Sequence, residues 1–250
     1  MAGRRWREIL RTVASTILDV ALPASCACCG RTGDPLCDAC LESIPRITGP
    51  TCTTCGRPSD PTPQPAGPIS ECASCRHAGS DLPTTRTSAT FDGTIRLAIH
   101  ALKYRDRPDV ARPLASLLEE PAMAVTAGVT PVVIPAALHP RRLDARGYDQ
   151  AKLLAMHLAR DCGWELMDVV ARIRDTDSQV GLGRAARRKN VAGAFRAMER
   201  LDGLHVLLVD DVMTTGATLI EASRACRAAG AASVVATCLA RDVPHAFPNP

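Results

Sequence analysis

The segment at residues 206–218 limits the possible folds of this chain more than any other. Its sequence is VLLVDDVMTTGAT, which is four apolar residues, two adjacent acids, and a short loop of hydroxyl residues and glycine. An apolar run without polar alternation is typical of a strand buried on both faces, as in a parallel sheet covered by helices. The sequence therefore predicts an α/β fold in which Asp210 and Asp211 follow a central strand, at the edge where such sheets bind ligands.

The loop after the two acids has the composition of an anion site. Thr214, Thr215 and Thr218 supply hydroxyl groups. Gly216 allows a close approach of the backbone, and a helix expected from about Ala217 presents its N-terminal N–H groups to an anion. The segment lacks the Gly-Lys-[Ser/Thr] ending of a P-loop, which argues against an ATPase.

Position for position, residues 206–218 resemble the phosphoribosyl pyrophosphate (PRPP) motif of type I phosphoribosyltransferases. The resemblance implies that Asp210 and Asp211 hold the ribose hydroxyls of PRPP and that residues 214–218 hold its 5′-phosphate. The alternative is that the two acids only end a strand and favour the positive end of the next helix.

The composition of the chain excludes several classes of protein. A length of 250 residues suits one sizeable core and a small module. Hydrophobic residues at 46%, charged residues at 22% and a net charge of +4 are ordinary for a globular protein. Aromatic residues at 3% argue against single-strand binding by successive base stacking. No apolar run of about 18 residues occurs, so we expect no membrane span.

Both termini of the chain are expected to lie outside the folded core. Polar residues interrupt the apolar stretch at residues 9–22, so residues 1–25 are predicted to form an amphipathic helix and not a signal peptide. Residues 242–250 are predicted to be a disordered tail. Without an export signal, we expect the protein to be cytoplasmic.

Nine of the twelve cysteines lie within residues 26–75 and include four Cys-x-x-Cys pairs. Two thiolates at this spacing bind one zinc ion, and two such pairs complete a closed structural site. The spacing predicts a double zinc ribbon at residues 26–80 with two structural Zn²⁺ ions. The expected ligands are Cys26, Cys29, Cys37 and Cys40 at one site, and Cys52, Cys55, Cys72 and Cys75 at the other. An interleaved pairing stays open, as do disulfides if the protein is secreted, and Cys28 is expected not to be a ligand.

The remainder of the chain is divided into a linker at residues 81–90 and a phosphoribosyltransferase-like domain at residues 91–241. Three of its segments carry cations that suit an anionic ligand. They are the end of a helix at Lys103, a strand-to-helix loop containing Arg146 and Gly147, and a stretch around Arg187 that is expected to be a mobile lid. The alternative for each segment is a basic surface exposed to solvent.

The order of these features along the chain is similar to the ComF family. The similarity rests on the zinc knuckles, the PRPP motif, and the segments Leu102-Lys103-Tyr104, Arg146-Gly147-Tyr148-Asp149-Gln150, Gln179…Leu182…Arg187…Asn190 and Gly193-Ala194-Phe195. Tyr148 and Asp149 stand where Phe and Asn are commoner. Membership implies a double zinc ribbon before a phosphoribosyltransferase-like domain, and a role in DNA uptake during natural transformation.

The leading hypothesis is a protein that binds PRPP with Mg²⁺ bridging the pyrophosphate, for transfer or for sensing. The acceptor of such a transfer cannot be named from the sequence. The expected catalytic residues are Asp210, Asp211, Arg146 and Arg187, and the expected PRPP contacts are Lys103, Arg146, Gly147, Asp210, Asp211, Thr214, Thr215, Gly216, Ala217 and Thr218. The alternative is an accessory protein whose zinc ribbons and basic lid contact single-stranded DNA and the uptake machinery, with a regulatory or vestigial PRPP site.

Overall fold

The computed structural model describes residues 25–58, 71–78, 81–174 and 192–243. The helix expected at residues 1–25, the tail expected at 242–250 and the lid expected around Arg187 fall wholly or almost wholly outside these ranges. None of the described helices is long and apolar enough to cross a membrane.

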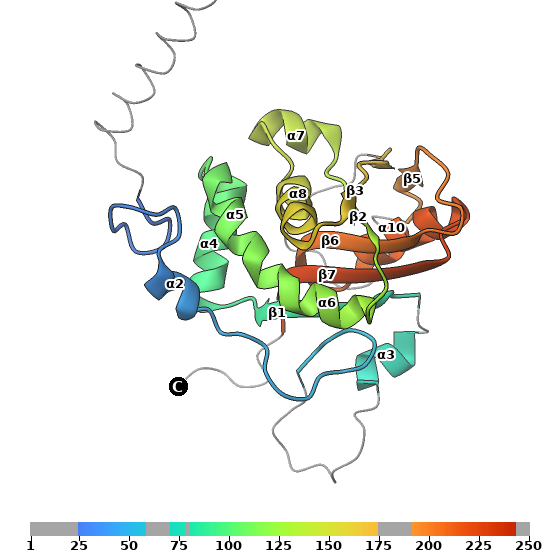
Figure 1. Cartoon of the computed structure of the whole chain (residues 1–250), viewed down its shortest axis with the longest axis horizontal. Helices are drawn as coiled ribbons and strands as arrows, with labels where there is room; N and C mark the ends of the chain where they lie inside the picture. The colour runs from blue at the N-terminus through green and yellow to red at the C-terminus, as the bar shows by residue number, and fades with distance from the viewer. Residues whose placement is uncertain (1–24, 59–70, 79–80, 175–191, 244–250) are drawn as a thin grey trace, which may run out of the picture.

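A five-stranded parallel sheet forms the centre of the molecule (Figure 1). In spatial order its strands are β1 (Thr84–Thr90), β7 (Ser233–Arg241), β6 (His205–Met213), β2 (Val132–Pro135) and β3 (Glu165–Leu166). All four neighbouring pairs are parallel. The predicted α/β class with a parallel sheet is therefore confirmed.

The strand β1 corrects the prediction of a linker at residues 81–90. Thr84 to Thr90 pair with β7 along one edge of the sheet. The segment TTRTSAT is rich in threonine, whose branched Cβ favours extended backbone. Thr85 and Thr87 are buried, so this part of the chain belongs to the core although its residues are polar.

Helices cover both faces of the sheet. The longer ones are α4 (Gly93–Tyr104), α6 (Glu119–Thr126), α8 (Gln150–Cys162) and α10 (Ala217–Ala228), and the shorter ones are α5 (Ala111–Ala115) and α7 (Pro140–Arg146). Two short 3₁₀ turns, Pro108–Val110 and Ser116–Leu118, flank α5. An antiparallel pair, β4 (Val170–Arg172) and β5 (Phe195–Ala197), lies beside α10.

The alternation of side chains along the strands divides the core into two clusters. On one face Val133 and Leu207 pack with residues of α4, α5 and α8, and the first zinc ribbon adds Cys26 and Cys37. On the other face Ile134 and Leu208 pack with residues of α10, and the second ribbon adds Cys52 and Cys55. Each ribbon is therefore part of a different core cluster.

The two ribbons repeat one local structure. In each, a single β-bridge, Ser25 with Thr32 or Thr51 with Pro58, closes a turn that contains Cys-x-x-Cys-Gly. Gly30 and Gly56 have positive φ values of 76° and 64°, which explains why glycine follows the second cysteine of the turn. The other cysteine pair begins a short helix, α2 (Asp38–Glu42) or α3 (Ala73–Ala78). These helices lie at separate places in the molecule (Figure 1).

Candidate functional site

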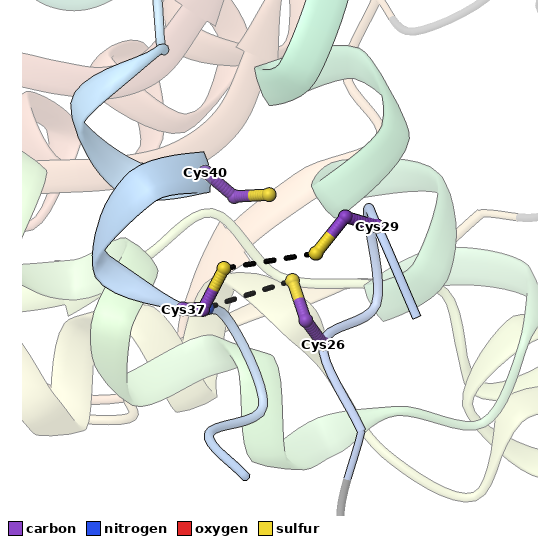
Figure 2. A group of neighbouring side chains, drawn as sticks. All are labelled: Cys26, Cys29, Cys37 and Cys40. Atoms are coloured by element: carbon purple, nitrogen blue, oxygen red, sulfur yellow. Dashed lines mark hydrogen bonds between the residues drawn. The ribbon is translucent and has the colours of Figure 1, made fainter. Parts of the chain in front are cut away.

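Two groups of four cysteines have the geometry of structural zinc sites. The structure brings together Cys26, Cys29, Cys37 and Cys40, and separately Cys52, Cys55, Cys72 and Cys75, with the sulfur atoms of each group within 4.8 Å of one another. This is the sequential pairing and not the interleaved alternative. Figure 2 shows the four sulfur atoms of the first group pointing toward a common centre.

The distances between sulfur atoms fit a bound zinc ion. Cys29 Sγ and Cys37 Sγ are 3.7 Å apart, as are Cys55 Sγ and Cys72 Sγ. A tetrahedral site with Zn–S bonds of about 2.3 Å has an S–S edge of about 3.8 Å. Such distances are too long for disulfides, whose sulfur atoms are about 2 Å apart. The eight thiols therefore fit two structural Zn²⁺ ions.

Backbone N–H groups donate hydrogen bonds to the first cysteine of each zinc site, and these bonds favour the thiolate form. The Cys37 N–H donates to Cys26 Sγ at 3.5 Å, and the Cys72 N–H donates to Cys52 Sγ at 3.2 Å. Burial raises the pKa of Cys26, but surrounding N–H groups outweigh it and lower that pKa to about 6. The thiolate is the form that binds zinc.

Cys28 lies outside the first sulfur cluster. Its thiol donates to the carbonyl oxygen of Thr94 in α4 at 3.6 Å. Burial, followed by the charges of the neighbouring cysteines, raises the pKa of Cys28 to about 11. A thiol with this pKa is a poor metal ligand at neutral pH, so the sequence expectation for Cys28 agrees with the structure.

A cavity of about 630 Å³ lies at the carboxyl ends of β2 and β6. This is the edge of a parallel sheet where ligands bind. Most of the residues expected to contact PRPP line this cavity, and they come from α4, α7, β6, the following loop and α10. They are Lys103, Arg146, Asp210, Asp211, Thr214, Thr215, Gly216, Ala217 and Thr218.

Among the expected site residues that the structure describes, Gly147 does not line this cavity. Gly147 has a φ of 78° and caps the C-terminus of α7, where its N–H donates to the carbonyl of Leu143. Its left-handed backbone explains the glycine without a ligand. Arg187 lies outside the described residues.

The two acids have different surroundings in the cavity. They form part of β6, which runs four residues beyond Val209 because β7 continues beside it and pairs with it. Asp211 Oδ1 accepts a hydrogen bond from Lys103 Nζ at 2.7 Å, and both side chains are largely buried, with 12% and 18% of their surface exposed. Burial raises the pKa of Asp210 to about 8, with a further contribution from the charge of Asp211.

The loop after β6 is held in a shape that suits an anion. Gly216, with a φ of 75°, is the residue before α10. A Cβ atom at Gly216 would lie 2.6 Å from Leu82 Cδ1, so glycine allows both the turn and the close contact. The helix that begins at Ala217 is 12 residues long, and its first N–H groups lie at the cavity wall. A helix N-terminus of this kind favours a phosphate group.

Arg146 is fixed at the cavity by two contacts. Its Nη1 donates to Gln150 Oε1 at 2.8 Å, and its guanidinium carbon lies 5.1 Å from the centre of the Tyr104 ring. The Tyr148 hydroxyl donates to the carbonyl of Leu102, which ties the start of α8 to the end of α4. The Lys103 and Arg146 segments, 43 positions apart in the sequence, therefore meet on one wall.

Arg172 is a cavity residue that sequence reasoning missed. It ends the short strand β4, and only 6% of its surface is exposed. Its guanidinium carbon lies 5.5 Å from the centre of the Phe195 ring, which holds the cation at the wall of the cavity. A single arginine in an unremarkable apolar stretch has no spacing signal, so only the fold reveals its position.

The raised pKa of Asp210 predicts a pH dependence of the ligand-free protein. The carboxyl is protonated in the folded state up to about pH 8 but ionises near 3.8 when unfolded. The folded state therefore binds more protons between these values, so Asp210 makes the free energy of unfolding fall as pH rises from about 4 to about 8. Asp210→Asn is expected to flatten this fall, so that the variant becomes more stable than wild type without ligand as pH approaches 8.

Thermal unfolding of wild type and Asp210→Asn at a series of pH values between 5 and 9 tests this expectation. Asp168→Asn is a matched control because Asp168 is exposed and pairs with Lys152 at the surface. An identical pH dependence in wild type and Asp210→Asn would show that Asp210 is ionised throughout this range.

Comparison with known proteins agrees with this two-part architecture. Residues 17–77 match the family described as double zinc ribbon domain, and residues 143–246 match the phosphoribosyl transferase domain.

Relatives match most of the chain. The DNA utilization protein YhgH of Salmonella typhi is 32% identical over 214 residues, which cover 83% of this chain and 91% of that protein. Competence protein F of Haemophilus influenzae is 29% identical, covering 82% and 90%. Competence protein ComFC of Bacillus subtilis is 25% identical, covering 82% of each. With its double zinc ribbon, its phosphoribosyltransferase-type domain and these relatives, the chain belongs to the ComF family.

Proposed function

We propose that this protein binds PRPP together with Mg²⁺ in the cavity at the carboxyl ends of β2 and β6. One observation carries the proposal: the acid pair, the hydroxyl loop, the helix N-terminus and two cations from distant segments line the same cavity. PRPP has matching parts, since it joins a 5′-phosphate and a pyrophosphate to a ribose with two free hydroxyls.

Each part of the cavity suits one part of PRPP. Carboxylates accept hydrogen bonds from hydroxyl groups, so Asp210 and Asp211 are assigned to the ribose. The N–H groups and hydroxyls of residues 214–218 are assigned to the 5′-phosphate. Lys103 and Arg146 are assigned to the pyrophosphate, because a cation beside phosphate oxygens forms strong charge-assisted hydrogen bonds.

The contact between Lys103 and Asp211 gives Lys103 a second role in the free protein. It neutralises one of two adjacent acids at a distance of 2.7 Å. A ligand that brings a pyrophosphate and Mg²⁺ supplies both a new partner for the lysine and a new positive charge near the acids. We therefore infer that Lys103 transfers its contact from Asp211 to the ligand on binding.

If the bound PRPP is used for transfer, the protein contributes electrostatics and orientation. The acids hold the ribose in place, while Arg146 and Lys103 stabilise the charge that develops on the departing pyrophosphate. Bound Mg²⁺ would neutralise part of that charge. Arg187 is proposed to act with these cations, and its segment lies outside the described residues. The acceptor is not identified by any described side chain.

Partial ligands test which groups of PRPP are recognised. Calorimetric titrations with PRPP, ribose 5-phosphate and inorganic pyrophosphate, each with Mg²⁺, are expected to give tight binding for PRPP and weaker binding for both fragments. Equal affinities for PRPP and pyrophosphate would mean that the acids and the loop do not contact the ligand.

The names of the relatives add a cellular role to this proposal. They describe DNA utilization and competence. We propose that the PRPP site serves DNA uptake during natural transformation, in a protein that acts in the cytoplasm. The same names favour the second candidate, an accessory protein that contacts single-stranded DNA through its zinc ribbons and basic segments.

Salt dependence separates these two candidates. Direct contact with DNA phosphates gives an affinity that falls steeply as salt concentration rises. Fluorescence anisotropy with a labelled single strand, at 50 and 200 mM salt, measures this. DNA binding that is strong, salt-dependent and unaffected by PRPP would favour the accessory role.

A further inference from the structure

Arg241 lies between the second zinc site and the end of β6, the strand that leads into the loop at residues 214–216. It is the last residue of β7, and only 6% of its surface is exposed. Its Nη1 donates to the carbonyl oxygen of Cys55 at 2.6 Å and lies 3.9 Å from Met213 Sδ. Cys55 belongs to the second zinc site, and Met213 immediately precedes the loop at residues 214–216. One buried guanidinium therefore touches both structures.

The charge of Arg241 needs a partner in this position. A buried cation is costly unless it is paired, and in the described part of the chain its Nε has no hydrogen-bond partner. The second zinc site supplies the opposite charge, because four thiolates around one Zn²⁺ carry two negative charges in excess. The loaded metal site thus holds the guanidinium electrostatically as well as through the Cys55 carbonyl.

Other contacts join the second ribbon to the edge strand β1 and to the core cluster beside the loop. The Thr85 N–H in β1 donates to the carbonyl of Thr54 at 2.8 Å. A Cβ atom at Gly56 would lie 2.8 Å from the Thr85 carbonyl oxygen, so the two backbones are in close contact. Cys52, Cys55 and Cys75 share a core cluster with Met213 and Leu219, which lie on either side of the loop.

The first ribbon has a different neighbour. Cys28 Sγ and Ser43 Oγ contact Thr94 at the beginning of α4. Its core contacts belong to the cluster on the other face of the sheet. The two zinc sites therefore have the same four-cysteine chemistry but contact different parts of the domain: the first lies at the start of α4, and the second lies beside Arg241 and the end of β6.

We propose that Arg241 is a positioning residue through which the second zinc site holds the loop at residues 214–216 in place. Zinc at the second site, and not at the first, then determines how well ordered residues 213–219 are. The consequence for PRPP affinity rests on the proposed function, whereas the effect on loop order is independent of any ligand.

Hydrogen exchange in the absence of PRPP tests the role of Arg241. Arg241→Met is expected to keep the zinc at both sites and to speed exchange in residues 213–219 by about tenfold, the effect of losing one charged hydrogen bond. Arg241→Lys keeps the charge but not the forked donor, and an intermediate effect is expected. Arg86→Met is the matched control, because Arg86 Nη1 donates to the carbonyl of Thr53 in the same ribbon, and its hydrogen bonds to described residues do not reach the loop.

Selective loss of each zinc ion tests the role of the metal. Cys72→Ser with Cys75→Ser removes two ligands of the second site, and Cys37→Ser with Cys40→Ser removes the equivalent pair of the first. Only the first of these double variants is expected to speed exchange in residues 213–219. This comparison and Arg241→Lys keep the proposal testable if Arg241→Met does not fold.

Two outcomes would overturn the proposal. One is unchanged exchange in residues 213–219 when Arg241 is replaced, and the other is equal loosening of the loop by loss of either zinc ion. PRPP affinity is measured on the same variants and is expected to fall about tenfold in Arg241→Met. If wild type fails to bind PRPP, the proposed function is wrong, and the exchange experiment still decides the role of Arg241.

Discussion

Replacing both Asp210 and Asp211 with asparagine is expected to weaken PRPP binding by about a hundredfold or more. Each carboxylate is proposed to accept a hydrogen bond from a ribose hydroxyl, and a hydrogen bond to a charged group contributes about 1.5–3 kcal/mol. Asparagine keeps the size of the side chain but loses the charge. Isothermal titration calorimetry with PRPP and Mg²⁺ measures the change in affinity.

The double variant should be as stable as wild type without ligand, within about 1 kcal/mol. Two effects oppose each other: the cost of burying an ionisable carboxyl at Asp210 beside Asp211 disappears, and Lys103 loses its partner Asp211 at 2.7 Å. Asp144→Asn, an exposed acid on the nearby helix α7, is the control and should bind PRPP as wild type does. Unchanged affinity in the double variant would contradict the assignment of the acids to the ribose.

Cys26→Ser is expected to remove one zinc ion and to unfold the first ribbon. Zinc binding contributes about 10–16 kcal/mol in isolated zinc-finger peptides, so folding of a small metal module depends on its ion. Elemental analysis should give two zinc ions per chain for wild type and one for the variant, because the structure contains two separate clusters. Limited proteolysis should then cleave residues 25–46 first.

Cys28→Ser is the control for this experiment. Cys28 lies two positions away, is a partly buried thiol, and donates to the Thr94 carbonyl without belonging to the sulfur cluster. It should keep two zinc ions and a folded ribbon. If Cys28→Ser lost a zinc ion and Cys26→Ser kept both, Cys28 would be the ligand and Cys26 would not.

The sequence predicted the parts of the structure that depend on local chemistry. The apolar run at residues 206–209 is a central strand, and the helix beginning at Ala217 follows the loop as expected. The spacing of each Cys-x-x-Cys pair lets two thiolates on one turn reach one ion, whereas the choice of sequential over interleaved pairing comes from the structure. These features arise within a few residues of each other, so a pattern in the sequence is enough.

The parts that were missed depend on contacts between distant segments. Residues 84–90 have a polar sequence that predicts a linker, and only pairing with β7 makes them a strand. The positions of Arg172 and Arg241 result from the packing of β4 and β7 against other elements. A lone arginine in an apolar stretch has no pattern that distinguishes a cavity wall from a surface.

The most direct test of the central claim is hydrogen exchange of residues 210–218 with and without PRPP and Mg²⁺. A ligand held by the acid pair, the loop and the helix N-terminus must slow exchange of the N–H groups in this segment, and we expect protection there that needs Mg²⁺ for its full extent. PRPP binding that leaves residues 210–218 unprotected, or an absence of binding by wild type, would contradict it.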